Sequence, residues 1–359
     1  MIDDQLFKAA LIAVAAAALA YGFVPALGPR WRGPGRALKI AGQVGLGVWF
    51  AYWSWQTIAS FFEQFPLHMD MIGFDARIYL HAAQTWLAGG DPWTAFADRH
   101  AWGEGAGYLR LYFAGPPPTV LAFVPFTWLS DDAMTTGWMA LTIGSAFYSL
   151  RRLGLPAWWI LFPPLTLGVF VGNPHIVCLA LLLCGSSWLR ALAAPMKAYA
   201  LIPMVGERQW KALGILAVAG TISVVVFWPL WMTYRADFSH VQAWMQDATW
   251  GGFSAARDPR LFAVTAGALG VLALIDRRGA AWLAVPALWP ASEFFYSTFA
   301  LPLRSPWLVA VLAVPGTQFD ARVPWAIVAY ATVRIILWLV VAVRSRRTAR
   351  LAPASPELA

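Results

Sequence analysis

Charged side chains are scarce in this chain of 359 residues: they make up 12% of it, while apolar residues make up 60%. A soluble domain carries about 25% charged and about 45–50% apolar residues, so the composition excludes an ordinary soluble protein. Repeated apolar stretches of about membrane-spanning length indicate an integral membrane protein that crosses the bilayer many times. The 22 tryptophans fit this class, because indole rings favour the membrane–water interfaces.

Cysteines and motifs for metals, nucleotides or nucleic acid are also sparse or missing. Cys178 and Cys184 lie six positions apart in one apolar stretch, which places them on different faces of a helix and argues against a disulfide. The chain has no Walker loop, HExxH, GxSxG, Asp-x-Asp or Cys/His metal pattern, so we expect no metal and no cofactor. The net charge of +8 sits mostly in short loops and the C-terminal tail, where it orients the chain and favours lipid headgroups over nucleic acid.

The distribution of these basic residues predicts a topology. An extra N-terminal span is expected over residues 6–27 with its N-terminus outside, because acidic residues precede it and the basic linker 28–39 follows it. The polar stretches 63–118 and 233–260 are expected to be external loops, and 344–359 a basic cytoplasmic tail. This topology predicts about eleven transmembrane helices in one all-α domain.

The other apolar segments are interpreted as full or partial spans. Two of them are short and meet at Gly172-Asn173-Pro174-His175, and interrupted segments of this kind commonly surround a site because their freed backbone must be satisfied inside the protein. Another short segment begins at Lys197, and an amphipathic helix is expected over 76–88 of the first loop. The expected spans are 41–62, 119–129, 134–150, 155–171, 176–188, 212–231, 261–275, 281–303, 307–314 (partial) and 325–343.

Three carboxylates stand out as candidates for chemistry. Asp75 lies just before the expected helix 76–88, so it is either a helix cap or a general base that takes a proton from an acceptor hydroxyl at the membrane surface. Asp70 is its rival. Glu293 lies inside the expected span 281–303, where a charged side chain is costly and commonly functional.

Three further polar residues lie in apolar surroundings. Asn173 is the only asparagine of the chain, and His175 is the only histidine outside the expected external loops. Polar groups inside a membrane are costly and commonly functional, although capping of a broken helix explains them equally well. Lys197 either pairs with a phosphate or extends towards lipid headgroups.

Arginines near the expected external face are candidates for holding a phosphate, because a guanidinium binds phosphate oxygens in pairs. These are Arg110, Arg257 and Arg260, and for each of them a solvated or lipid-paired side chain is the simpler interpretation. Arg334 lies within the last span, where it pairs with a lipid phosphate or with a carboxylate.

Several motifs together resemble glycosyltransferase family 87, over most of residues 71–302. The family's pattern is Asp, three residues, Tyr, a helix of small residues and Gly-Asn-Pro-Tyr, followed by Tyr-Pro-Pro, Gly-Gln, Lys-x-Tyr/Pro and a late Ser-Pro…His-Tyr…Pro segment. The matching residues here are Asp75 to Tyr79, Ala82-Ala83, Trp86-Leu87, Gly90-Asp91-Pro92-Trp93, Tyr112 with Gly115-Pro116-Pro117, Gly172-Asn173, Lys197-Ala198-Tyr199 and the segment from Pro290 to Pro302 with Tyr296. Departures are Trp93 for Tyr, Asp91 for Asn, Asn173 for Gln, and Ser292 and Glu293 near the late His position.

This resemblance implies the GT-C architecture and a glycosyltransferase activity. The expected reaction is an inverting, metal-independent transfer of mannose or a pentose from a polyprenyl-phosphate donor to a lipid-linked or cell-envelope glycan. The resemblance also implies that the protein acts at the external face of the bacterial cytoplasmic membrane, with Asp75 as the base. The residues expected to shape the site are Tyr79, Tyr112, Asn173, His175, Glu293 and Tyr296.

Two other functions stay open. A transporter of lipid-linked sugars, or a non-catalytic binding subunit, would share the broken spans without requiring Asp75. A glycan polymerase or ligase that uses a polyprenyl-diphosphate donor would depend on loop residues such as His240 and Arg257.

Overall fold

The computed structural model shows an all-helical chain, as the sequence predicts. Within the residues it describes, the exception is one short antiparallel pair, in which Phe96 lies opposite Leu111 and Ala97 opposite Arg110. The structure describes residues 32–64, 72–94, 96–97, 110–111, 113–247, 254–315 and 321–351.

The first half of the chain alternates long helices with short ones. Its elements are α2 (Arg32–Gln64), α3 (Phe74–Leu87), β1 (Phe96–Ala97), β2 (Arg110–Leu111), α4 (Pro117–Phe123), the 3-10 helix η4 (Val124–Trp128), α5 (Asp131–Leu153), η5 (Ala157–Leu161), α6 (Pro163–Phe170) and α7 (His175–Leu183).

The second half begins with several very short helices and ends in a helix of 30 residues. Its elements are α8 (Ser187–Ala191), α9 (Ala193–Met196), η6 (Ala198–Ala200), α10 (Leu201–Gly206), α11 (Trp210–Val226), α12 (Trp228–Asp247), η7 (Ala255–Arg257), α13 (Pro259–Ile275), α14 (Arg277–Leu288), η8 (Phe294–Leu303), α15 (Pro306–Leu312) and α16 (Arg322–Leu351).

The ends of several helices follow from local sequence. The Ser130 side chain accepts a hydrogen bond from the backbone N–H of Ala133 and so begins α5, which ends at Gly154 with φ 64°. The Asp258 carboxylate accepts from the backbone N–H groups of Arg260 and Leu261 at the start of α13. Side-chain caps and left-handed glycines satisfy backbone groups that a helix end leaves unpaired.

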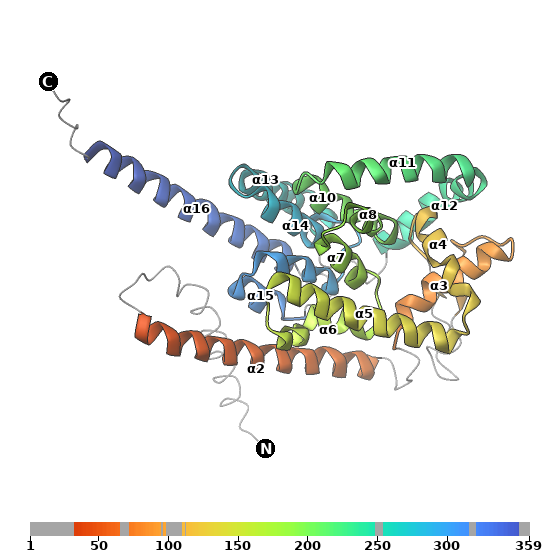
Figure 1. Ribbon diagram of the computed structural model, residues 1–359, viewed down its shortest axis with the longest axis horizontal. Helices are drawn as coiled ribbons and strands as arrows, with labels where there is room; N and C mark the ends of the chain where they lie inside the picture. The colour runs from red at the N-terminus through yellow and green to blue at the C-terminus, as the bar shows by residue number, and fades with distance from the viewer. Residues whose placement is uncertain are drawn as a thin grey trace, which may run out of the picture.

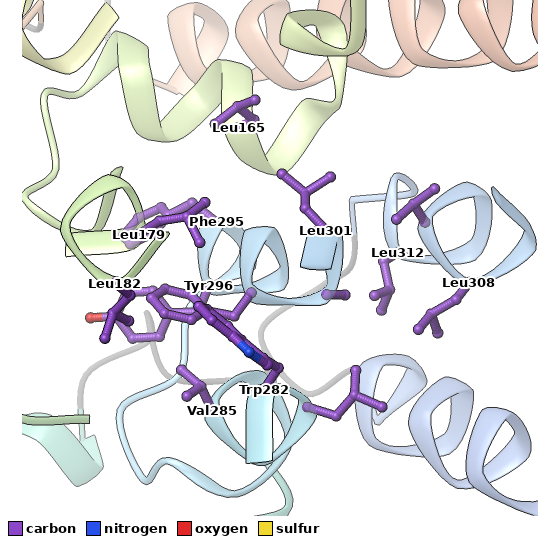
Figure 2. Packing of buried hydrophobic residues seen from close by; sticks show 14 of the residues in the cluster. Leu165, Leu179, Leu182, Trp282, Val285, Phe295, Tyr296, Leu301, Leu308 and Leu312 are labelled. Carbon is purple, nitrogen blue, oxygen red and sulfur yellow. The ribbon is translucent and has the colours of Figure 1, made fainter. Parts of the chain in front are cut away.

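The main hydrophobic core lies where α6 and α7 meet η8, α14 and α15. Figure 2 shows Leu165 and Leu179 on one side of this core, with Phe295, Leu301 and Trp282 facing them from elements more than one hundred residues later. Because burial of such side chains stabilises by about 1.5–3 kcal/mol each, this packing holds the late segment against the broken segment in the middle of the chain.

The outer helices are placed around this core (Figure 1). Helix α2 runs along α6 and η5, and the Ser54 hydroxyl donates a hydrogen bond to the carbonyl of Leu161 in η5 over 2.6 Å. Helices α3, α4 and α12 gather at one end of the molecule, while the C-terminal part of α16 projects from the body. Arg334 of α16 pairs with Asp276 over 3.5 Å, so the carboxylate partner expected for this arginine is present.

Some of the apolar helices have the length and composition to cross a membrane. One does so alone, over residues 322–343. Two bent pairs qualify if each counts as one span: α6 with α7, bent by 116°, and α11 with the first part of α12, bent by 93°. Among the described residues, one to three helices therefore pass this test.

Some sequence-based boundaries are confirmed. The loop helix expected over 76–88 is α3, and the interruption expected at 172–175 separates α6 from α7. The short segment after Lys197 is η6 with α10, and the partial span expected over 307–314 is the seven-residue α15. The N-terminal span expected over 6–27 lies outside the described residues.

Other boundaries are wrong. The expected span 119–129 is divided between α4 and η4, and the expected loop 233–260 is helical as far as Asp247. The expected span 281–303 is broken between Leu288 and Phe294, because Pro290 has no N–H to continue the α14 ladder. Helices α2 and α16 extend beyond the expected spans, into the linker 28–39 and the tail 344–359, since charged residues are tolerated at helix ends outside an apolar stretch.

Gly172→Ala is expected to destabilise the protein. Gly172 has φ 68°, and a methyl group on its Cα would lie 2.9 Å from the Cα of Gly73, which is backbone and cannot turn away. Left-handed strain alone costs about 1–3 kcal/mol, so the thermal unfolding midpoint in detergent should fall by several degrees.

Gly137→Ala is the matched control, since Gly137 lies within α5 and nothing lies within 4 Å of the added methyl group. Alanine is favoured over glycine in a helix by about 1 kcal/mol, so this variant should unfold at the wild-type temperature or above it. Equal midpoints for Gly172→Ala and wild type would contradict the close approach of the two glycines.

Candidate functional site

Backbone hydrogen bonds fasten the start of α3 to the break between α6 and α7. The N–H of Gly73 donates to the carbonyl of Phe170 over 3.1 Å, and the N–H of Asp75 donates to that of Val171 over 2.9 Å. The indole N–H of Trp138 donates to the carbonyl of Gly172 over 2.7 Å. The first predicted loop and the interrupted segment are thereby brought together across about one hundred residues of sequence.

Asp75 and Asn173 meet at this junction. The Nδ2 of Asn173 donates to Oδ2 of Asp75 over 2.6 Å. Gly73 occupies the cap position of α3 and no side chain caps that helix end, so the interpretation of Asp75 as a cap is wrong. The carboxylate binds a distant amide instead.

His175 fixes the orientation of the Asn173 amide. Its backbone N–H donates to Oδ1 of Asn173 over 3.0 Å, so Oδ1 faces His175 and Nδ2 faces Asp75. The ring Nδ1 of His175 also lies 3.1 Å from Oδ1, an acceptor, which requires the proton of a neutral imidazole on Nδ1. Asn173 therefore accepts the first N–H of α7 with one side-chain atom and binds Asp75 with the other.

Lys197 lies between two tyrosines. Its Nζ donates to the hydroxyl of Tyr296 over 3.4 Å and lies 5.2 Å from the ring centre of Tyr79 and 5.7 Å from that of Tyr296. Aromatic faces attract a cation at such distances, so the two rings hold the ammonium in place. Lys197 is also the cation whose charge acts on both Asp75 and Glu293.

Glu293 belongs to the same cluster. It directly precedes η8, and the N–H of Tyr296 donates to its backbone carbonyl over 3.0 Å. The charge of Asp75 acts on Glu293, and the charge of Glu293 acts on Tyr79 and Tyr296. The Pro-containing turn that interrupts the expected span 281–303 thus carries Glu293.

Polar groups that orient the cluster are buried, whereas its charged groups reach its surface. Asn173 is 3% exposed and His175 is 0% exposed, and the rings of Tyr79 and Tyr296 are nearly as buried. Asp75, Lys197 and Glu293 are each partly exposed.

Both carboxylates lie outside the helices that qualify as membrane spans, and both have raised pKa values. Burial raises the pKa of Asp75, and the Lys197 charge and the Asn173 hydrogen bond lower it in part. Burial, together with the like charge of Asp75, raises the pKa of Glu293 to about 8 against the opposing effect of Lys197. Two nearby carboxyl groups that resist simultaneous ionisation are typical of acid–base sites.

An apolar groove is lined in part by residues that flank Lys197 in the sequence, whereas Lys197 itself does not line it. It has a volume of ≈ 250 Å³. Pro195 and Ala198, the neighbours of Lys197 in sequence, line one part of it, and Val224 and Trp231 of α11 and α12 line another.

The predicted arginines are not part of this cluster as far as it is described. Arg257 and Arg260 are exposed near the start of α13, next to the capping Asp258. The backbone of Arg110 is in β2, but its side chain, like all of Tyr112 and Asp70, lies outside the described residues.

Other residues of the site were missed by sequence reasoning. Phe295 stacks on His175 with ring centres 4.8 Å apart, and Tyr199 packs on Tyr296 at the same distance. Tyr199 is part of the Lys-x-Tyr motif, which could have indicated its place, whereas the glycine before Phe74 and the indole of Trp138 offered no signal. Within the described ranges, no three His, Cys, Asp or Glu side chains are grouped so that they could hold a metal ion.

Comparison of the chain with protein-family models, with curated proteins and with solved structures finds no match.

Proposed function

We propose that this chain is a membrane glycosyltransferase that moves mannose or a pentose from a polyprenyl-phosphate donor to a lipid-linked or cell-envelope glycan, with inversion. The observation that carries this proposal is the meeting of Asp75, Asn173 and Lys197, which come from three distant segments. One oriented carboxylate and one cation are what such a transfer needs, because the phosphate leaves once its developing charge is stabilised.

Asp75 is the general base of the proposed reaction. Asn173 holds Oδ2, which leaves Oδ1 to take the proton of the acceptor hydroxyl as that oxygen attacks the anomeric carbon. The partial exposure of Asp75 lets an acceptor reach it. His175 acts behind Asn173 as a positioning residue.

Lys197 binds the phosphate of the donor. An ammonium held between aromatic rings keeps its place when the phosphate leaves, so its charge is available to the departing group without rearrangement. The groove that begins at Pro195 and Ala198 would take the first part of the polyprenyl chain. Arg110 remains a proposed second cation for this phosphate.

The proposed setting is the bacterial cytoplasmic membrane, with about eleven transmembrane helices in a GT-C arrangement and the site on the external face. Support comes from the composition, from the membrane-spanning length of helix 322–343 and from the two bent apolar pairs. Broken apolar helices around a polar site are common in proteins that act on substrates at membrane depth. Glycolipid acceptors and membrane lipids are the proposed partners.

The direct test is transfer of radiolabelled sugar by the purified full-length protein. The donors are polyprenyl-phosphate mannose and polyprenyl-phosphate arabinose, each with a native lipid extract as acceptor. We expect one donor to label the extract. Binding of both donors without transfer would support the transporter or binding subunit instead, and transfer from a polyprenyl-diphosphate donor alone would support the polymerase or ligase.

A further inference from the structure

A second groove, here called the elbow groove, lies where α11 and α12 meet at an angle of 93°. Figure 1 shows α11 along one edge of the molecule and α12 turning away at its end, beside α4. The elbow groove has a volume of ≈ 350 Å³ and is lined by Val224 of α11 and by residues of α12 alone. Val224 and Trp231 line both this groove and the one that contains Pro195 and Ala198, so the two grooves adjoin.

Two contacts fix the walls of the elbow groove. The indole N–H of Trp231 donates to the hydroxyl of Ser223 over 3.2 Å, which ties the first turn of α12 to the last turn of α11. The ring of Tyr234 packs on the buried ring of Trp93, with ring centres 5.1 Å apart. The fold itself therefore forms the groove before any ligand enters it, as is usual for ligand sites.

The lining of the elbow groove is apolar apart from one guanidinium and one phenol. Among the described residues that line it, Arg235 alone carries a charge, and aromatic side chains such as Trp228 and Phe238 form much of the rest. An apolar groove with one cation matches a ligand that has an apolar chain and an anionic head. A guanidinium binds the oxygens of a phosphate in pairs, so a phosphate is the head group that Arg235 fits best.

The surroundings of the elbow groove suit a lipid. Helix α11 exposes apolar side chains along its length, with Val218 62% and Val225 73% exposed, and bilayer chains cover such a surface in the proposed membrane setting. With α11 along the membrane normal, the 93° bend lays α12 in the plane of the membrane. Trp228 and Arg235 then lie near the head groups, where indole rings and basic side chains are favoured.

We propose that the elbow groove binds one phospholipid with an anionic head group, its acyl chain along Trp228 and Trp231 and its phosphate on Arg235. The single guanidinium selects a net negative head group over a zwitterionic one, because the cation of a zwitterionic head offsets the attraction of its phosphate. This site rests on the proposed membrane setting and is independent of sugar transfer. The bound lipid would border the groove proposed for the polyprenyl chain at Val224 and Trp231.

Native mass spectrometry of the delipidated full-length protein tests the head group. The probes are phosphatidylglycerol and phosphatidylcholine with the same acyl chains. We expect the first phosphatidylglycerol to bind about five- to tenfold more tightly than the first phosphatidylcholine, and Arg235→Gln to abolish this preference. Arg151→Gln is the matched control, because Arg151 is exposed on α5 and does not line the groove, and it should keep the wild-type preference.

A second pair of variants tests the groove itself. Val224→Trp places a bulky ring where the two grooves adjoin and should weaken binding of the first phosphatidylglycerol about tenfold, equivalent to roughly two CH₂ groups that are no longer buried. Val218→Trp is the control, since Val218 lies on the same helix but lines neither groove, and it should bind as wild type does.

Several outcomes would overturn the proposal. Equal affinity of wild type for the two lipids, or an unchanged preference in Arg235→Gln, would remove the anionic head group, and unchanged binding by Val224→Trp would remove the groove. Competition by glycerol 3-phosphate would identify a site for a soluble phosphate instead. Displacement by farnesyl phosphate that depends on Arg235 would assign the groove to an isoprenoid. Because no turnover is measured, each result is obtained whether or not the protein transfers sugar.

Discussion

Asp75→Asn is expected to lower sugar transfer by about 10²- to 10⁴-fold, the usual contribution of a positioned general base. Asparagine at this position still offers an oxygen to Nδ2 of Asn173, so the fold and the binding of donor should be retained. The measurement is the initial rate of transfer at saturating donor, together with donor affinity and the elution profile in size-exclusion chromatography.

Asp91→Asn is the matched control on the same stretch of chain. The Asp91 carboxylate accepts from the N–H of Trp93 over 2.9 Å, a turn that asparagine forms equally well. Its transfer rate should stay close to that of wild type. A folded Asp75→Asn variant that transfers at the wild-type rate would remove Asp75 as the base, and Asp70 or Glu293 would then become the candidate.

Lys197→Gln is expected to weaken donor binding and to slow transfer, with a combined loss of about 10²- to 10³-fold, comparable to the removal of a preorganised group that stabilises transition-state charge. Glutamine retains a donor for the Tyr296 hydroxyl but brings no charge to the phosphate. Both KM for the donor and kcat should change, because the ammonium acts on the bound phosphate and on the departing one. Steady-state kinetics over donor concentration separates the two effects.

Two variants sharpen this result. Lys211→Gln removes an exposed lysine at the start of α11 and should leave both kinetic constants unchanged. Lys197→Arg should remain impaired despite its charge, because a planar guanidinium does not fit the space of an ammonium between the rings of Tyr79 and Tyr296. Full activity of Lys197→Gln would contradict the phosphate role of this lysine.

Much of the candidate site could be predicted from single residues whose chemistry conflicts with their surroundings. Asn173, Lys197 and Glu293 each stand in apolar sequence, where a polar group is costly unless it is paired. Glycine and proline around Asn173 indicated the break at which it lies. The structure brings these three residues together with Asp75, at the positions that the sequence interpretation had selected separately.

The partners of these polar side chains could not be predicted, because they come from segments that are distant in the sequence. Nothing local to Asp75 indicates Asn173 as its partner, and the sequence fits a helix cap and a general base equally well. Helix lengths were misjudged for a related reason. Apolar runs predict burial, but Pro290 divides one run into two elements, and α12 continues through polar residues as far as Asp247.

At the junction between α3 and the α6–α7 break, the groups that hold the site together differ from the groups that carry its charge. Backbone groups of Gly73 and Asp75, with the indole of Trp138, form the support, whereas the side chains of Asp75, Lys197 and Glu293 carry the charges. Exchanging those side chains leaves the supporting bonds in place. The fold is therefore an evolvable one: libraries that vary the three charged positions should yield mostly folded proteins, from which altered donor preference can be selected.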